Sequence, residues 1–249
     1  MQANIVLTVS ESKRLIAQAV GVLPCVRRAL KEGVLAIATG TTTSYVAEEL
    51  LGHPISKRKY VTGYTHPAAL DPKQELPEEN LPDIVFRNGE LVEGITRREA
   101  ARQFTPGDVF IKGGNALNYE RKIVGVTVGG GEAGTMGANL GPIIGLRATL
   151  VLPIGLEKLV AHDIMETVRI LGEGEDQIND APQLFPTTGE IVTEIEAVHL
   201  LTGARAIHVG SGGILGAEGS VRLLLCGDRE TVPRALEIVE TIQGEPNFR

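Results

Sequence analysis

Short runs of apolar residues alternate along this chain with segments whose apolar positions recur at helical spacing. Residues 34–38 and 109–111 are uniformly apolar and residues 148–152 are apolar apart from Thr149, which is typical of strands buried on both faces of a sheet. Residues 10–23 and 156–171 instead place their apolar side chains along one side, as a helix against a core does. The alternation predicts an α/β protein with a mostly parallel, Rossmann-like open sheet flanked by helices.

Turn and cap signals divide the rest of the chain. Asn88-Gly89 suits the type I′ turn of a hairpin over 84–92, and Thr96 is a candidate cap for a short helix to Phe104. Proline and charged residues over 66–82 predict a surface loop, and a similar composition over 172–189 predicts a linker. Further strands are expected at 59–63, at 123–128 and as a pair around 210–219, and further helices at 24–33, 44–51, 190–201 and 230–242.

The position of the predicted linker suggests how the chain is organised. We expect a main ligand-binding domain over residues 1–155 and a smaller C-terminal α/β lobe or lid over 156–249, with the boundary somewhere in 155–189. A chain of 249 residues with 43% hydrophobic residues is long enough for this arrangement or for one large domain. The alternative is that the strand at 221–225 and the final helix of this lobe pair with another copy in a homo-oligomer.

Charge and hydropathy exclude several classes of partner. The net charge of −7 argues against a general nucleic-acid surface, which needs a basic face. No run approaches the roughly 20 apolar residues that span a bilayer, and the first residues lack the features of a secretory signal. We therefore expect a cytoplasmic protein without a membrane partner. A small anion remains compatible with an acidic chain, because local backbone amides and one lysine can hold it.

Cofactor and metal sites find little support in the motifs. The two cysteines are far apart, no two histidines have ligand spacing, and the glycine-rich loop 129–137 is not a dinucleotide fingerprint, so we expect neither a metal nor a cofactor. Gly130 and Gly131 in that loop are secondary candidates for approaching a phosphate, the alternative being a flexible connection. His66 follows a predicted strand and is the best histidine candidate, although a surface histidine is the plainer interpretation.

Two loops that follow apolar strands carry the strongest candidate chemistry. In the first, Gly40 allows a tight turn, and the unpaired amides of Thr41, Thr42 and Thr43 would lie at a helix start. The helix dipole adds about half a positive charge there, so Thr39 to Thr43 predict a site for a phosphate or carboxylate. The alternative is that the threonines only cap their own helix.

The second loop runs from Lys112 through Gly113, Gly114 and Asn115 towards Glu120. Lys112 would stand at the carboxyl end of its strand, close to the first loop if the two strands are neighbours. The glycines would let a substrate approach the backbone or form an anion-binding nest. Glu120 could then abstract a proton α to a carbonyl while Lys112 stabilises the negative charge. The alternative is a solvated Glu120 paired with Arg121 or Lys122.

These two loops together resemble a known enzyme family. Ala38-Thr-Gly-Thr-Thr-Thr-Ser44 is similar to the T-G-[ST]-T phosphate loop of ribose-5-phosphate isomerase, and Ile111-Lys-Gly-Gly-Asn-Ala-Leu-Asn-Tyr-Glu-Arg-Lys-Ile123 is similar to its I-K-G-G-G-x-x-L-x-x-E-K-I segment. The likeness covers about residues 10–160 and extends to the wider isomerase and coenzyme A transferase fold group. It implies phosphate binding at Gly40, Thr41 and Thr42, substrate binding at Lys112 to Gly114, and Glu120 as the catalytic base.

Two departures from the family pattern shape the functional prediction. Glu120 follows Lys112 by eight positions, where the family has nine, and the family's D-G-A-D-E loop is replaced by residues 102–110 with Asp108 as its only aspartate. We therefore predict a protein that binds a phosphorylated or other anionic small molecule. It would be a sugar-phosphate isomerase-like or acyl/coenzyme A transferase-like enzyme of unassigned substrate. The alternative is a ligand-sensing or binding protein without turnover on the same fold.

Overall fold

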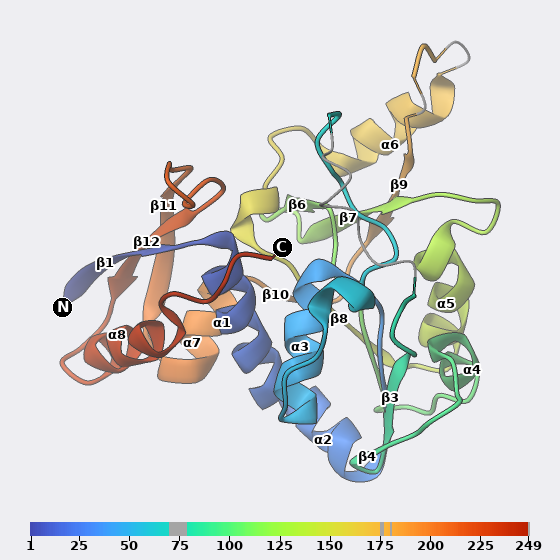
Figure 1. The fold of residues 1–249 in the computed structure, drawn as a ribbon, viewed down its shortest axis with the longest axis horizontal. Coiled ribbons are helices and arrows are strands. Elements are labelled where there is room, and N and C mark those ends of the chain that lie inside the picture. Colours follow the sequence, from blue (N-terminus) through green and yellow to red (C-terminus); the bar gives the residue numbers. More distant parts are fainter. Residues whose placement is uncertain (70–78, 175–176, 180, 249) are drawn as a thin grey trace.

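The computed structural model describes residues 1–69, 79–174, 177–179 and 181–248. Within these residues, eight α-helices accompany three β-sheets, so the mixed α/β class predicted from the sequence is confirmed (Figure 1). Parts of the predicted surface loop 66–82 and of the predicted linker 172–189 lie outside the described residues. In the part of the chain that the structure describes, no helix is both long and apolar enough to cross a membrane.

The central sheet is built from the uniformly apolar runs. Its order is β10-β8-β5-β2-β3-β4, in which the first four strands are parallel and the last two form an antiparallel hairpin. The expected mostly parallel sheet is therefore present. The strands are β2 (Val34–Ile37), β3 (Ile84–Arg87), β4 (Glu90–Leu91), β5 (Val109–Ile111), β8 (Thr149–Pro153) and β10 (Glu190–Val192).

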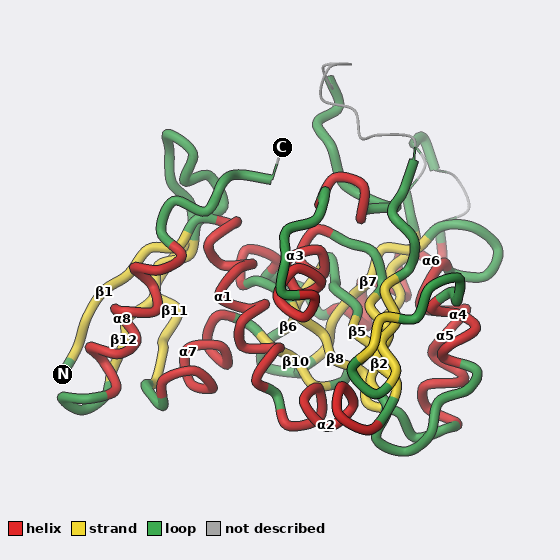
Figure 2. Tube along the Cα trace, turned by 60° about the horizontal axis from the view of Figure 1, so that its bottom comes forward, coloured by secondary structure: helices red, strands yellow, loops and turns green. Residues whose placement is uncertain are grey.

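Helices cover both faces of this sheet. Figure 2 shows α1 and α3 on one side of the central strands and α4 and α5 on the other. Side chains from both layers are buried against the strands, which is why the strand sequences are apolar without alternation. The helices of this region are α1 (Val9–Val22), α2 (Pro24–Glu32), α3 (Thr41–Leu51), α4 (Arg97–Ala101) and α5 (Gly134–Gly145).

A second, antiparallel sheet joins the two ends of the chain. Its order is β1-β12-β11, with Ile5 of β1 opposite Leu223 of β12. The sequence analysis missed β1, and β10 from the second half of the chain belongs to the central sheet. Strands from the two sides of the proposed boundary near 155 therefore pair with each other in two sheets: β1 with β12, and β8 with β10. A separate C-terminal lobe stays a prediction. The elements are β1 (Gln2–Leu7), α7 (Glu194–Thr202), β11 (Arg205–Ser211), β12 (Val221–Cys226) and α8 (Thr231–Ile242).

The third sheet is small and antiparallel, with the order β6-β7-β9. Strand β9 lies inside the predicted linker, and β6 follows directly after the Lys112 loop. The predicted helix over 156–171 is interrupted: a 3-10 turn at its start is followed by a bend, and Asp163 then caps α6 by accepting a hydrogen bond from the Met165 amide. The elements are β6 (Ala116–Asn118), β7 (Ile123–Val128), η3 (Leu156–Lys158), α6 (Ile164–Glu173) and β9 (Gln183–Thr187).

Local signals predicted turns and caps better than element types. Asn88 and Gly89 both have positive φ, at 52° and 86°, as the predicted hairpin turn requires, and Thr96 closes a capping box on α4. The expected strand at 59–63 is wrong, because a 3-10 helix, η1 (Lys57–Tyr60), occupies its first residues. The first helix begins at Val9, one residue before the expected start at residue 10, and Thr8 caps it.

Candidate functional site

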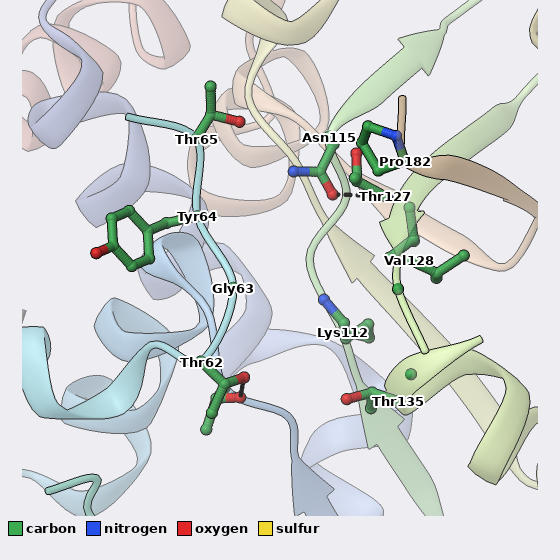
Figure 3. Close-up of a pocket in the computed structure, with 14 residues that line it drawn as sticks. Thr62, Gly63, Tyr64, Thr65, Lys112, Asn115, Thr127, Val128, Thr135 and Pro182 are labelled. Atoms are coloured by element: carbon green, nitrogen blue, oxygen red, sulfur yellow. Dashed lines mark hydrogen bonds between the residues drawn. The ribbon is translucent and has the colours of Figure 1, made fainter. Parts of the chain in front are cut away.

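A cavity of about 440 Å³ lies beyond the carboxyl ends of the central strands. This volume falls within the range of small-molecule sites, and the edge is where open α/β sheets bind ligands. Lys112 extends into the cavity between the Thr62 segment and Thr135 (Figure 3). Four segments of the chain contribute to the lining of the cavity. They are Thr39 after β2, Thr62 to Thr65 after η1, Lys112 and Asn115 after β5, and residues between Thr127 and Thr135 before and at the start of α5.

Strand pairing brings the two predicted loops together. Ile37 of β2 is the partner of Ile111 of β5, and the amide of Ala38 donates to the Ile111 carbonyl at 2.9 Å. The next residues, Thr39 and Lys112, therefore leave the sheet side by side and both line the cavity. The expectation that Lys112 lies close to the threonine loop is confirmed by this register.

The threonine loop starts a helix at the expected place, but only one of its residues lines the cavity. Helix α3 begins at Thr41, and the Gly40 amide already donates to the Tyr60 carbonyl at 2.9 Å. Thr43 Oγ1 returns a hydrogen bond to the Gly40 carbonyl, whereas Thr42 Oγ1 is buried without a partner among the described residues. Thr39 is the member of this loop that lines the cavity, so Thr41 to Thr43 stand beside it rather than in it.

Lys112 contributes a positively charged ammonium group to the lining of this cavity. Its Nζ donates to the Gly113 carbonyl at 3.1 Å, and no carboxylate of the described residues forms an ion pair with it. Burial, reinforced by the nearby charges of Lys158 and Arg97, lowers the pKa of Lys112 to about 8. An anion entering the cavity would therefore meet a cation that no carboxylate neutralises.

Hydroxyl and amide groups surround this lysine. Thr39 Oγ1 and Thr62 Oγ1 are 2.7 Å apart and share a hydrogen bond. Asn115 accepts a hydrogen bond from the Thr127 amide through Oδ1 at 3.0 Å, which leaves its amide nitrogen for other partners. Thr135 lies in the first turn of α5, so the positive end of this 12-residue helix faces the same space. Figure 3 shows the ring of Tyr64 directed away from Lys112.

The two glycines after Lys112 have different surroundings. A methyl group on Gly114 would lie 2.2 Å from Val124 Cγ1 and 3.0 Å from Ile154 Cδ1, whereas one on Gly113 would come no nearer than 3.6 Å to its closest neighbour, the Pro153 carbonyl. Lys158 Nζ also donates to the Gly114 carbonyl at 2.9 Å. Close packing accounts for Gly114, and no ligand needs to be invoked for it.

This contrast gives a prediction about stability. Gly114→Ala should lower the free energy of unfolding by about 1–3 kcal/mol, because the buried Val124 side chain would have to move in a packed core. Gly113→Ala is the matched control and should stay within about 0.5 kcal/mol of the wild type. Urea unfolding of the three proteins measures both effects, and equal stability of the two variants would contradict the packing argument.

The proposed catalytic base lies apart from the cavity. Glu120 is exposed in the turn between β6 and β7, and it is not among the residues that line the cavity. Its neighbours Arg121 and Lys122 pair with Asp163 and Glu196 instead of with Glu120. The role of Glu120 as a base stays a prediction, and nothing in its present position brings it to Lys112.

The secondary candidates, His66, Gly130 and Gly131, are not lining residues of the cavity either. His66 is exposed, stacks against Tyr64 with ring centroids 5.7 Å apart and is not a lining residue of the cavity. Gly130 and Gly131 line a neighbouring hollow of about 590 Å³, which shares Gly134 and Thr135 with the cavity. The glycine-rich loop therefore forms part of the wall between two adjacent spaces.

Sequence reasoning missed Thr62 and Thr135 as lining residues. Thr62 was assigned to a strand that the chain does not form. A usable signal existed for Thr135: a strand ending at Val128, a glycine-rich loop and then a helix repeat the pattern that had drawn attention to Thr39. The charge of Arg97, which reaches Lys112 from α4, has no such signature in the sequence.

Comparisons with protein-family models, curated proteins and solved structures found no match to this chain. The resemblance to ribose-5-phosphate isomerase therefore stays a prediction. Any function has to be inferred from the residues of the cavity and from their positions in the fold.

Proposed function

We propose that this protein binds a phosphorylated or other anionic small molecule in the cavity at Lys112. The observation that carries the proposal is the Lys112 ammonium group, which faces this space without a carboxylate partner among the described residues. Threonine hydroxyls and the first turn of α5 supply further donors. The place beyond the carboxyl ends of parallel strands is also the one expected for a Rossmann-like sheet.

The chemistry of the lining favours binding over proton abstraction by a carboxylate. Among the described residues that line the cavity, none is an aspartate or a glutamate. A sugar-phosphate isomerase-like or coenzyme A transferase-like reaction would thus require Glu120 to approach from the β6–β7 turn. A ligand-binding or sensing protein without turnover, the second candidate, needs no such movement. Glu120→Gln separates the two, because it should abolish turnover in an enzyme and leave the affinity of a sensor unchanged.

Removal of the lysine charge gives the direct test of binding. Lys112→Gln should raise the dissociation constant for inorganic phosphate by about tenfold to a hundredfold, the effect of losing one charge-assisted hydrogen bond. Isothermal titration calorimetry measures the change. Lys31→Gln, which removes the same charge from an exposed position on α2, is the matched control and should bind as the wild type does.

The pH dependence of the same titration provides a second check. Free Lys112 loses its proton as the pH rises through about 8, so phosphate affinity should fall over that range. Burial, and then the neighbouring charges of Lys158 and Arg97, make this loss occur at a lower pH than for an exposed lysine. Equal phosphate affinity of wild type and Lys112→Gln at pH 7 would refute the proposed site.

A further inference from the structure

The amine of Lys112 stands out among the groups that can react in this cavity. Of the described lining residues, Lys112 and Tyr64 are the ones with titratable side chains, and the Tyr64 ring points away (Figure 3). The ammonium group of Lys158 and the guanidinium group of Arg97 lie close enough to influence Lys112, while no described carboxylate pairs with it. A lysine placed among other cations in a sheltered site is the arrangement that activates an amine as a nucleophile.

The protonation state of Lys112 is consistent with this role. With a pKa of about 8, set mainly by burial and then by Lys158 and Arg97, roughly one in ten Lys112 side chains is neutral at pH 7. An unperturbed lysine has well under one in a thousand neutral at that pH. The difference matters because only the neutral amine has the free electron pair that attacks carbon.

We propose that Lys112 forms an imine with an aldehyde or ketone that also carries an anionic group. This inference rests on the proposed function and names its substrate class. The anionic group would lie at the threonines and the first turn of α5, and the carbonyl carbon would face Lys112 Nζ. The hydroxyls of Thr39 and Thr62, which are 2.7 Å apart, line the same cavity and could donate to the oxygen of the addition product.

The reaction balances without another reactant. The lone pair of the neutral amine attacks the carbonyl carbon, the π electrons move to oxygen, and a proton passes from the nitrogen to this oxygen to give a neutral carbinolamine. Its hydroxyl then leaves as water with a further proton while the nitrogen lone pair forms the C=N bond. Starting from the ammonium form, one lysine and one carbonyl yield one protonated imine and one water.

Trapping with dihydroxyacetone phosphate and sodium cyanoborohydride tests the inference. Cyanoborohydride delivers hydride to the carbon of the protonated imine, so the electron pair of the C=N bond returns to nitrogen and a stable secondary amine remains. Peptide mass mapping of the wild-type protein then locates the product. We expect it at Lys112, formed about fiftyfold faster at pH 8 than at pH 6 because the neutral fraction of the amine rises from about 1% to about 50%, and slowed by inorganic phosphate.

Three comparisons make the experiment specific. Lys13 provides an internal control: burial, with the nearby Lys158 charge, also lowers its pKa to about 8, but it is 7% exposed and does not line the cavity, so it should remain unmodified. Dihydroxyacetone without phosphate should react at Lys112 at least about tenfold more slowly, since it lacks the anionic anchor. Lys112→Arg should lose the product, whereas Lys31→Arg on α2 should keep it.

The possible results separate the inference from the proposed function. Stabilisation of the wild type by phosphate without a product at Lys112 would overturn the imine and leave the anion site intact. A product at Lys112 that forms equally fast with the neutral ketone, without any effect of phosphate, would support the amine chemistry and overturn the anionic substrate class. Labelling spread evenly over surface lysines would overturn the inference as well.

Discussion

Asp108→Ala should lower the free energy of unfolding by about 3–5 kcal/mol. The side chain is 2% exposed, and both of its oxygens are in use. Oδ1 accepts from the Val34 amide at 2.7 Å, and Oδ2 accepts from the Thr105 amide at 2.6 Å and from Thr105 Oγ1 at 3.1 Å. Truncation would leave the buried Val34 amide at the start of β2 without its hydrogen-bond acceptor.

Urea unfolding at pH 7 measures this loss. Thr105→Ala is the matched control, because it removes only the hydroxyl bond and should cost about 1 kcal/mol. A change below about 1 kcal/mol for Asp108→Ala would show that the carboxylate is not needed to join β2 to β5. Asp108 stands at the amino end of β5, whereas Lys112 stands beyond its carboxyl end. Asp108, the one aspartate where the isomerase has its D-G-A-D-E loop, therefore has a structural role and is not among the residues that line the cavity.

The part of the site that lies on the central sheet was predictable. Uniformly apolar runs identify strands buried on both faces, and such strands are parallel in α/β proteins. Their carboxyl ends must then meet at one edge, so the residues that follow β2 and β5 come together if these two strands are neighbours. The expected neighbourhood of Thr39 and Lys112 depended on that condition, and the pairing of β2 with β5 fulfils it.

The antiparallel strands β6 and β9 of the small third sheet were not predictable from the same signals. Strand β9 contains Pro186, which argues against a strand, but β9 is the edge of its sheet and can accommodate a residue without an amide hydrogen. Strand β6 has three residues, too few to show a period, and its pairing with β7 creates the turn that holds Glu120 away from the cavity. The position of Glu120 thus depends on a hairpin that the sequence spacing to Lys112 could not reveal.

Glu194→Gln should make the protein more stable at pH 8 and leave its stability nearly unchanged at pH 4. Glu194 opens α7 directly after β10 and is completely buried. Its Oε2 accepts from the Leu156 amide at 2.9 Å, while Oε1 has no partner among the described residues. Burial, together with the nearby Glu157 charge, raises the pKa of Glu194 to about 7 from an ordinary 4.5.

The sign follows from proton binding in the two states. Below pH 4.5 the carboxyl is protonated in both the folded and the unfolded protein, so it carries no penalty. Between about 4.5 and 7 the unfolded chain has lost the proton and the folded protein keeps it, so wild-type stability falls as the pH rises. Above pH 7 the folded protein bears a buried charge, at a cost on the order of 3 kcal/mol.

Glutamine keeps an oxygen for the Leu156 amide and has no charge to bury, so Glu194→Gln should recover about 2–3 kcal/mol at pH 8 in urea unfolding. Glu196→Gln on the same helix is the opposing control. Burial alone would raise the pKa of Glu196, but hydrogen bonds from Thr193 and Tyr119 hold it below its usual value, so its charge stabilises the fold at pH 8. That variant should be less stable than the wild type at pH 8, and a gain there would contradict the assignment of opposite electrostatic roles to these two neighbours.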